Sequence, residues 1–172
     1  MTTAIKALAG AAAAVCLATT AASETWDMAT PYGDSVFHTQ NVAQFAQDVE
    51  AATNGALSFK LHTAGSLFKH PEIKNAVRSG LAPIGEFFLS LAANENDVFG
   101  LDSQPFLATS YEDAAKLWDA QRAEVAKLLA AQGLTPLFAV PWPPQGLYVG
   151  KPVESVDDLK GLRFRTYNAA LE

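Results

Sequence analysis

The sequence has little cysteine, histidine and charge, and each shortage excludes a class of protein. Cys16 is the only cysteine among the 172 residues, so no internal disulfide framework can hold the chain. The three histidines, His38, His62 and His70, lie far apart in the sequence without metal-ligand spacing. Charged residues make up 17% of the chain, and the formal net charge of −6 gives no attraction to nucleic acid or anionic lipid.

The first 23 residues are apolar and small, with Lys6 as their only charge. This pattern predicts a secretory signal peptide over residues 1–23 and an exported, periplasmic protein. A retained membrane anchor is one alternative, although the run is short for a span and mostly alanine. A lipoprotein linked through Cys16 is another, although Val15 is bulky where such signals have a small residue. Loss of Lys6 would take the net charge from −6 to −7.

Short apolar strands alternate with amphipathic helices over the next 117 or so residues, the order that produces right-handed βαβ crossovers. Proline at the start of the second helix (Pro71) and the pair Ser110 and Asp113 at the start of the third are helix-initiation signals. These features predict an α/β fold of βαβ units with a mostly parallel sheet. The expected strands are 24–28, 57–61, 81–88 and 134–140, and the expected helices are 35–53, 71–80 and 110–132.

A basic strand follows a short helix near the end of the chain. Asp157 and Asp158 suit the first turn of that helix, and Gly161 suits its left-handed cap. Residues 162–165 then alternate apolar and basic, which predicts a strand with an apolar face and a face carrying Arg163 and Arg165. An arginine on a rigid strand can hold a carboxylate by two parallel hydrogen bonds, and the alternative is an ordinary surface charge.

Residues 146–165 read Gly-Leu-Tyr-Val-Gly-Lys-Pro-Val-Glu-Ser-Val-Asp-Asp-Leu-Lys-Gly-Leu-Arg-Phe-Arg. This run resembles the extracytoplasmic solute-binding proteins of tripartite ATP-independent periplasmic (TRAP) transporters, the DctP-like family, and a looser similarity extends from Thr25 to the end of the chain. The resemblance implies a periplasmic binding protein-like fold of two lobes that close on a ligand. It assigns residues 24–145 to lobe 1 and 146–172 to a crossover strand and the start of lobe 2. Because family members are about twice as long, we expect a truncated, N-terminal portion.

The resemblance also implies a ligand and a partner. Arg165 stands where the family's second arginine holds the substrate carboxylate. The implied function is capture of a small organic acid, without catalysis or cofactor, by a monomer that delivers it to the TRAP permease. Sialic-acid-binding members carry a further arginine at the position of Gln145, so a smaller or less polar acid is indicated here.

Further candidates surround the expected site. Tyr32 follows the first strand at its carboxyl end, where open α/β sheets place ligands. Trp142 is held among prolines and could form a wall for an organic substrate. Phe88 falls near a family position that reaches the cleft, and Asn168 is expected to open the next helix with a donor and an acceptor. For Tyr32 and Phe88 the alternative is ordinary core packing.

Three rival interpretations remain at the level of sequence. An enzyme is disfavoured because no Gly-x-Ser-x-Gly, P-loop or Gly-x-Gly-x-x-Gly motif occurs, and the adjacent Asp157 and Asp158 would point apart on a helix. A sensory binding protein would share the same pocket and differ in its outer surface. A portion of this length could also fail to fold stably, since exposed strand edges would lack partners.

Overall fold

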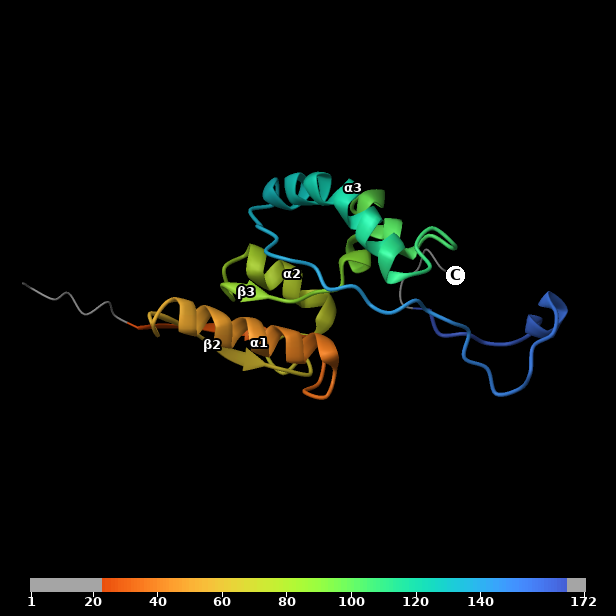
Figure 1. Cartoon of the computed structure of the whole chain (residues 1–172), viewed down its shortest axis with the longest axis horizontal. Coiled ribbons are helices and arrows are strands. Elements are labelled where there is room, and N and C mark those ends of the chain that lie inside the picture. Colours follow the sequence, from red (N-terminus) through yellow and green to blue (C-terminus); the bar gives the residue numbers. More distant parts are fainter. Residues whose placement is uncertain (1–22, 167–172) are drawn as a thin grey trace, which may run out of the picture.

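The computed structural model describes residues 23–166, so most of the expected signal peptide and Asn168 lie outside the described residues. Three parallel strands form the sheet in the order β2-β1-β3 (Figure 1). They are β1 (Glu24–Ala29), β2 (Leu57–His62) and β3 (Ile84–Gly85). Strand β1 pairs with β2 along its whole length, from Glu24 opposite Leu57 to Ala29 opposite His62, and with β3 only at Met28 and Ala29. The predicted α/β class with βαβ units is therefore confirmed.

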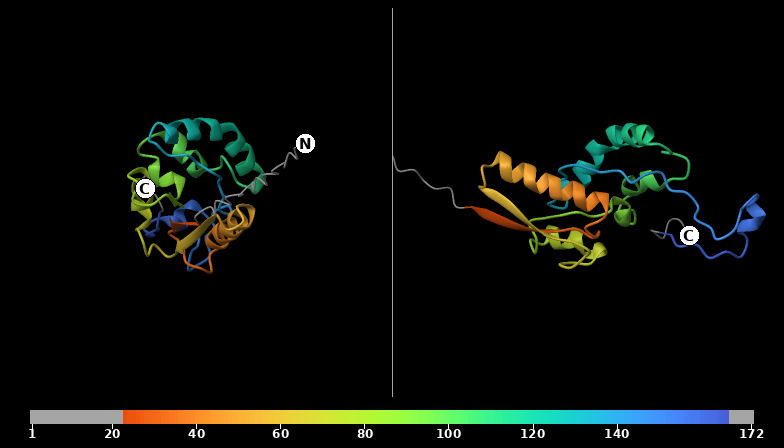
Figure 2. Two further views of the ribbon diagram at one scale, coloured as in Figure 1. Left: turned by 90° about the vertical axis from the view of Figure 1, so that its left-hand side faces the viewer. Right: turned by 60° about the horizontal axis from the view of Figure 1, so that its bottom comes forward.

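Two helices connect the strands and lie on opposite faces of the sheet (Figure 2). Helix α1 (Phe37–Ala52) covers one face, and α2 (His70–Arg78) covers the other. Their inward side chains meet the carboxyl end of β1, and the buried residues there are Met28, Ala29, Val42, Ile73 and Ala76. Burial of apolar surface between these layers, at about 25 cal/mol per Å², fixes where the carboxyl ends of the strands emerge.

A second group of helical segments packs beside the sheet. The 3₁₀ helices η1 (Leu89–Ala92) and η2 (Asp97–Ser103) lie against α3 (Tyr111–Ala130) around the buried ring of Phe99. The chain between β3 and α3 thus contains two short helices. Lys74 of α2 forms an ion pair with Glu95, which ties this group to the sheet layer.

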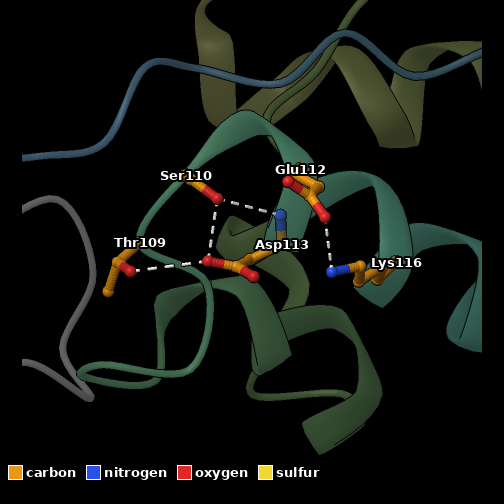
Figure 3. Close-up of polar contacts among 5 residues, drawn as sticks. All are labelled: Thr109, Ser110, Glu112, Asp113 and Lys116. Atoms are coloured by element: carbon orange, nitrogen blue, oxygen red, sulfur yellow. Dashed lines mark hydrogen bonds and ion pairs between the residues drawn. The ribbon is translucent and has the colours of Figure 1, made fainter.

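The predicted start of the long helix is confirmed in atomic detail (Figure 3). The Ser110 hydroxyl accepts a hydrogen bond from the Asp113 amide at 3.1 Å and donates one to the Asp113 carboxylate at 2.8 Å. The first turn therefore has a satisfied cap, while Glu112 and Lys116 form an ion pair on the exposed side of the helix at 2.7 Å. Hydrogen bonds from Ser110 and from the backbone and side chain of Thr109, opposed in part by burial, lower the pKa of Asp113.

The predicted strand 81–88 is wrong except at Ile84 and Gly85. The amides of Leu81 and Ala82 both donate to the carbonyl of Ala76, closing the end of α2, so they are unavailable to a sheet. Pro83 has no N–H to give to a neighbouring strand.

The predicted strands at 134–140 and 162–165 are also wrong, and so is the crossover strand expected from residue 146 onward, since those residues have no sheet pairing within residues 23–166. The Leu134 amide closes α3 by donating to Leu129, and Tyr148 is 88% exposed. After α3 the chain passes the sheet layer and then extends away from it to the 3₁₀ turn η3 (Val156–Leu159) (Figure 1). A strand needs a neighbour to complete its hydrogen bonds, and within residues 23–166 none lies beside these segments.

The short helix before the basic stretch is present as η3. Asp157 and Asp158 lie in its first turn, and Gly161 has a φ of +76°, as the predicted left-handed cap requires. The Asp158 carboxylate accepts hydrogen bonds from the amides of Ser155 and Glu154, and these bonds lower its pKa.

Candidate functional site

Aromatic side chains gather at the carboxyl edge of the sheet, where the loops after β1 and β3 meet the starts of α1 and α2. Tyr32 lies at the centre of this group. Its ring centroid is 5.2 Å from that of Trp142 and 5.4 Å from those of His38 and His70. We call the set Tyr32, Phe37, His38, His70 and Trp142 the aromatic cluster. The structure thus brings together Tyr32 and Trp142, two candidates that are remote in sequence.

Trp142 is positioned by His38. The two rings lie 4.1 Å apart at 35°, and the Phe37 ring is 5.4 Å from the indole. His38 Nε2 lies 3.2 Å from the carbonyl oxygen of Val140, which fastens the segment after α3 to the start of α1. Burial lowers the pKa of His38, with the Val140 contact opposing the shift, so the imidazole is neutral at neutral pH and Nε2 carries the proton that it donates.

Phe88 reaches the same region through its backbone. Its amide donates to His70 Nε2 at 2.9 Å, and the His70 ring meets Tyr32 edge-on. A nitrogen that accepts a hydrogen bond carries no proton, so His70 is the neutral tautomer protonated at Nδ1. Burial lowers the pKa of His70 in agreement with this geometry.

A carboxylate also lies at this edge. Glu86 directly follows β3, and its amide donates to the carbonyl of Ala29 at 2.8 Å. The Thr30 hydroxyl donates to Glu86 Oε2 at 2.5 Å, and Thr30 itself is fully buried. Burial raises the pKa of Glu86, while the bond from Thr30 opposes part of the increase.

Glu86 acts in turn on the phenol of the aromatic cluster. Burial raises the pKa of Tyr32, a hydrogen bond from the Trp142 side chain opposes part of the rise, and the negative charge of Glu86 adds to it. The Tyr32 hydroxyl therefore remains protonated and able to donate. The edge combines aromatic faces, a hydroxyl donor and a carboxylate acceptor, which is a composition suited to holding a small polar organic molecule.

The remaining candidates are not gathered there. Arg165 is exposed, and Gln145 is exposed with its side-chain amide donating to the nearby Pro143 carbonyl at 3.1 Å. Leu162 and Phe164, expected on a core-facing strand, are 38% and 44% exposed.

Sequence reasoning missed Thr30, His38, His70 and Glu86. Three of the four directly follow a strand or open a helix at the carboxyl edge, so the rule that located Tyr32 could have located them too. Within residues 23–166 no group of three or more His, Cys, Asp or Glu side chains is placed to hold a metal ion. Every helix in that range is too short or too polar to span a bilayer.

A parallel sheet between two helical layers, with aromatic and polar side chains at its carboxyl edge, is the arrangement in which open α/β proteins place their ligands. The chain belongs to the bacterial extracellular solute-binding protein family 7 (DctP), which it matches over residues 28–172. That family consists of solute-binding receptors rather than enzymes, and TRAP receptors are among its members.

Three relatives illustrate the match. DctP7, a Bordetella pertussis extracytoplasmic solute receptor binding pyroglutamic acid, is 45% identical with a TM-score of 0.82, covering 86% of this chain and 49% of that one. A marine metagenome TRAP solute-binding protein specific for pyroglutamate is 48% identical with a TM-score of 0.82, covering 87% and 49%. A solute-binding protein of Albidiferax ferrireducens is 30% identical over 132 residues, or 75% of this chain and 38% of the relative. The chain thus spans about half the length of the two solved structures and less of the curated relative.

Proposed function

We propose that this protein is a periplasmic receptor that captures pyroglutamate, a cyclic amide of glutamate with one free carboxylate, and delivers it to a TRAP permease. The observation that carries the proposal is the likeness to two pyroglutamate-binding receptors at 45% and 48% identity, each with a TM-score of 0.82. The aromatic cluster supports it, because ring faces suit the apolar atoms of a small five-membered ring.

In this proposal the carboxylate and the ring contact different parts of the protein. Residues 24–145 form lobe 1, which presents the aromatic cluster and Phe88, and residues 146–172 begin lobe 2, which presents Arg165 and Asn168. The guanidinium of Arg165 holds the carboxylate in two parallel hydrogen bonds once the lobes close. Gln145 is the last residue of lobe 1 and lies next to the hinge in this proposal. Lobe 2 would then bind the carboxylate of the ligand, and lobe 1 would bind its ring.

The test is a calorimetric titration of the full-length protein with L-pyroglutamate. Because a removed partner leaves the ligand charge unpaired in a closed site, Arg165→Ala should weaken binding by at least about 30-fold. Arg165→Lys should also weaken binding, because an ammonium cannot form the planar fork. Arg163→Ala, a matched loss of charge two residues away, should bind nearly as the wild type does. Wild-type affinity in Arg165→Ala would refute the role of this residue, and no pyroglutamate binding by the wild type would refute the ligand.

A further inference from the structure

Glu86 lies at the carboxyl edge of the sheet, and only one of its two carboxylate oxygens accepts a hydrogen bond within residues 23–166. One oxygen accepts the Thr30 hydroxyl at 2.5 Å. Within residues 23–166 the other oxygen has no hydrogen-bond partner, and no lysine, arginine or histidine forms an ion pair with this carboxylate. The backbone bond from Glu86 to Ala29 holds the residue rigidly at the end of β3.

A structural role alone does not explain a glutamate at this position. Glu86 is half-buried, and partial burial of a carboxylate without a counter-ion disfavours its charged form, which raises the pKa of this residue. The Thr30 hydroxyl needs only an acceptor, which the neutral side chain of glutamine would also provide. An ionisable group that is unfavourable to the fold and lies in a binding region is a functional candidate.

The chemistry of the proposed ligand supplies the missing partner. The ring of pyroglutamate has one N–H donor and, on the adjacent carbon, one carbonyl acceptor. Glu86 offers an acceptor, and the protonated hydroxyl of Tyr32, close enough to sense the charge of Glu86, offers a donor. We propose that the second oxygen of Glu86 accepts a hydrogen bond from the ring N–H of the ligand and makes the site selective for lactams that carry this hydrogen. This inference rests on the proposed function.

This selectivity can be tested with the lactone 5-oxotetrahydrofuran-2-carboxylate, in which a ring oxygen replaces the N–H. The carboxylate of Glu86 would face this oxygen as two opposed acceptors, so the wild type should bind the lactone at least about 10-fold more weakly than pyroglutamate. In Glu86→Gln the side-chain amide can donate to the ring oxygen or accept from the ring N–H. The preference of this variant for pyroglutamate over the lactone should therefore fall to within about 3-fold.

Glu24→Gln is the matched control, because Glu24 lies at the opposite end of β1 and its carboxylate accepts a hydrogen bond from Trp26 Nε1, far from the aromatic cluster. It should keep the wild-type preference. N-methyl-pyroglutamate provides a test that needs no variant, since the methyl group removes the donor and the wild type should reject it. Titrations of the full-length wild type and both variants, with thermal unfolding as the folding check, complete the design.

The outcomes separate the two proposals. The assignment is supported if Glu86→Gln loses the preference for pyroglutamate over the lactone while Glu24→Gln keeps it. The wild type must also reject the N-methyl ligand. A wild type that binds pyroglutamate but accepts the lactone or the N-methyl analogue equally well would overturn it while leaving the proposed function intact. An unchanged preference for pyroglutamate over the lactone in Glu86→Gln would also overturn the assignment and leave the proposed function intact. If the wild type fails to bind pyroglutamate, both proposals fall.

Discussion

Helix α2 packs closely on the sheet at Gly85 of β3, and this contact offers a sharp test of the architecture beneath the site. A Cβ at this position would lie 2.7 Å from Ile73 Cγ2, 3.2 Å from Val77 Cγ2 and 3.4 Å from the Ala29 carbonyl oxygen. Carbon atoms pack at about 3.5–4.0 Å, so α2 would have to move outward by roughly 1 Å. Ile73 cannot yield easily because its side chain is fully buried.

Overpacking of this kind typically costs about 1–3 kcal/mol, which we therefore expect for Gly85→Ala. At about 2–4 °C per kcal/mol for a chain of this size, the midpoint of thermal unfolding should fall by roughly 2–12 °C. Gly33→Ala is the matched control, since a Cβ there meets nothing within 4 Å. It should leave the midpoint unchanged or slightly raised.

A double variant identifies the cause. Ile73→Ala alone should cost about 2–5 kcal/mol by leaving a cavity. In the double variant the new methyl group of residue 85 occupies part of that cavity, so the total should fall short of the sum by about 0.5–3 kcal/mol. Gly85→Ala with the stability of Gly33→Ala, or strict additivity with Ile73→Ala, would show that α2 does not press on β3 as described.

Two further changes test the helical group. Ser110→Ala should lower the free energy of unfolding by about 1 kcal/mol in chemical denaturation, because the Asp113 amide loses its cap, whereas Lys116→Ala should change it little because that ion pair is exposed. Phe99→Ala should cost about 3–5 kcal/mol, since Phe99 is 1% exposed and central to the contacts of α3. An equal loss for Ser110→Ala and Lys116→Ala, or a Phe99→Ala midpoint near that of the wild type, would contradict these assignments.

The first half of the fold was predictable because its signals are local. Periodicity located α1 and α3, alternation located β2, and the cap at Ser110 marked a helix start to the residue. The strand predictions beyond Gly133 failed for a different reason. Alternation at residues 162–165 specifies which face each side chain would take, but a strand forms only where a neighbour supplies hydrogen bonds, and local sequence carries no information about that neighbour.

The candidate site was predictable where a rule of topology applied. Tyr32 was located because parallel strands direct ligands to their carboxyl ends, and Trp142 because prolines immobilise it. The contact between Trp142 and His38 depends on how the segment after α3 returns across α1, which no local pattern encodes. Glu86 was missed because the predicted strand 81–88 placed it inside a strand, whereas β3 ends at Gly85 and the contact with Thr30 is visible only in the structure.

The stability of the unliganded protein should depend on Glu86 in a pH-dependent way. Its pKa is raised above the ordinary value of about 4.5, first by burial, so the native state binds a proton more tightly than the unfolded chain does. The contribution of Glu86 is therefore most favourable below the ordinary value and is lost as pH rises through the raised one. Glu86→Gln should consequently be more stable than the wild type at about pH 7, with the difference shrinking toward about pH 4.

Comparison with the variant isolates this one group, because all other titrating residues are common to both proteins. The nearby His70 accepts a hydrogen bond from Phe88 in its neutral form and supplies no compensating charge at neutral pH. Chemical denaturation at the two pH values measures the difference. If Glu86→Gln is less stable than the wild type at neutral pH, then the charge of Glu86 is already compensated in the unliganded protein. Its carboxylate would then have no unmet need for the N–H of a ligand, and the case for lactam recognition would weaken with it.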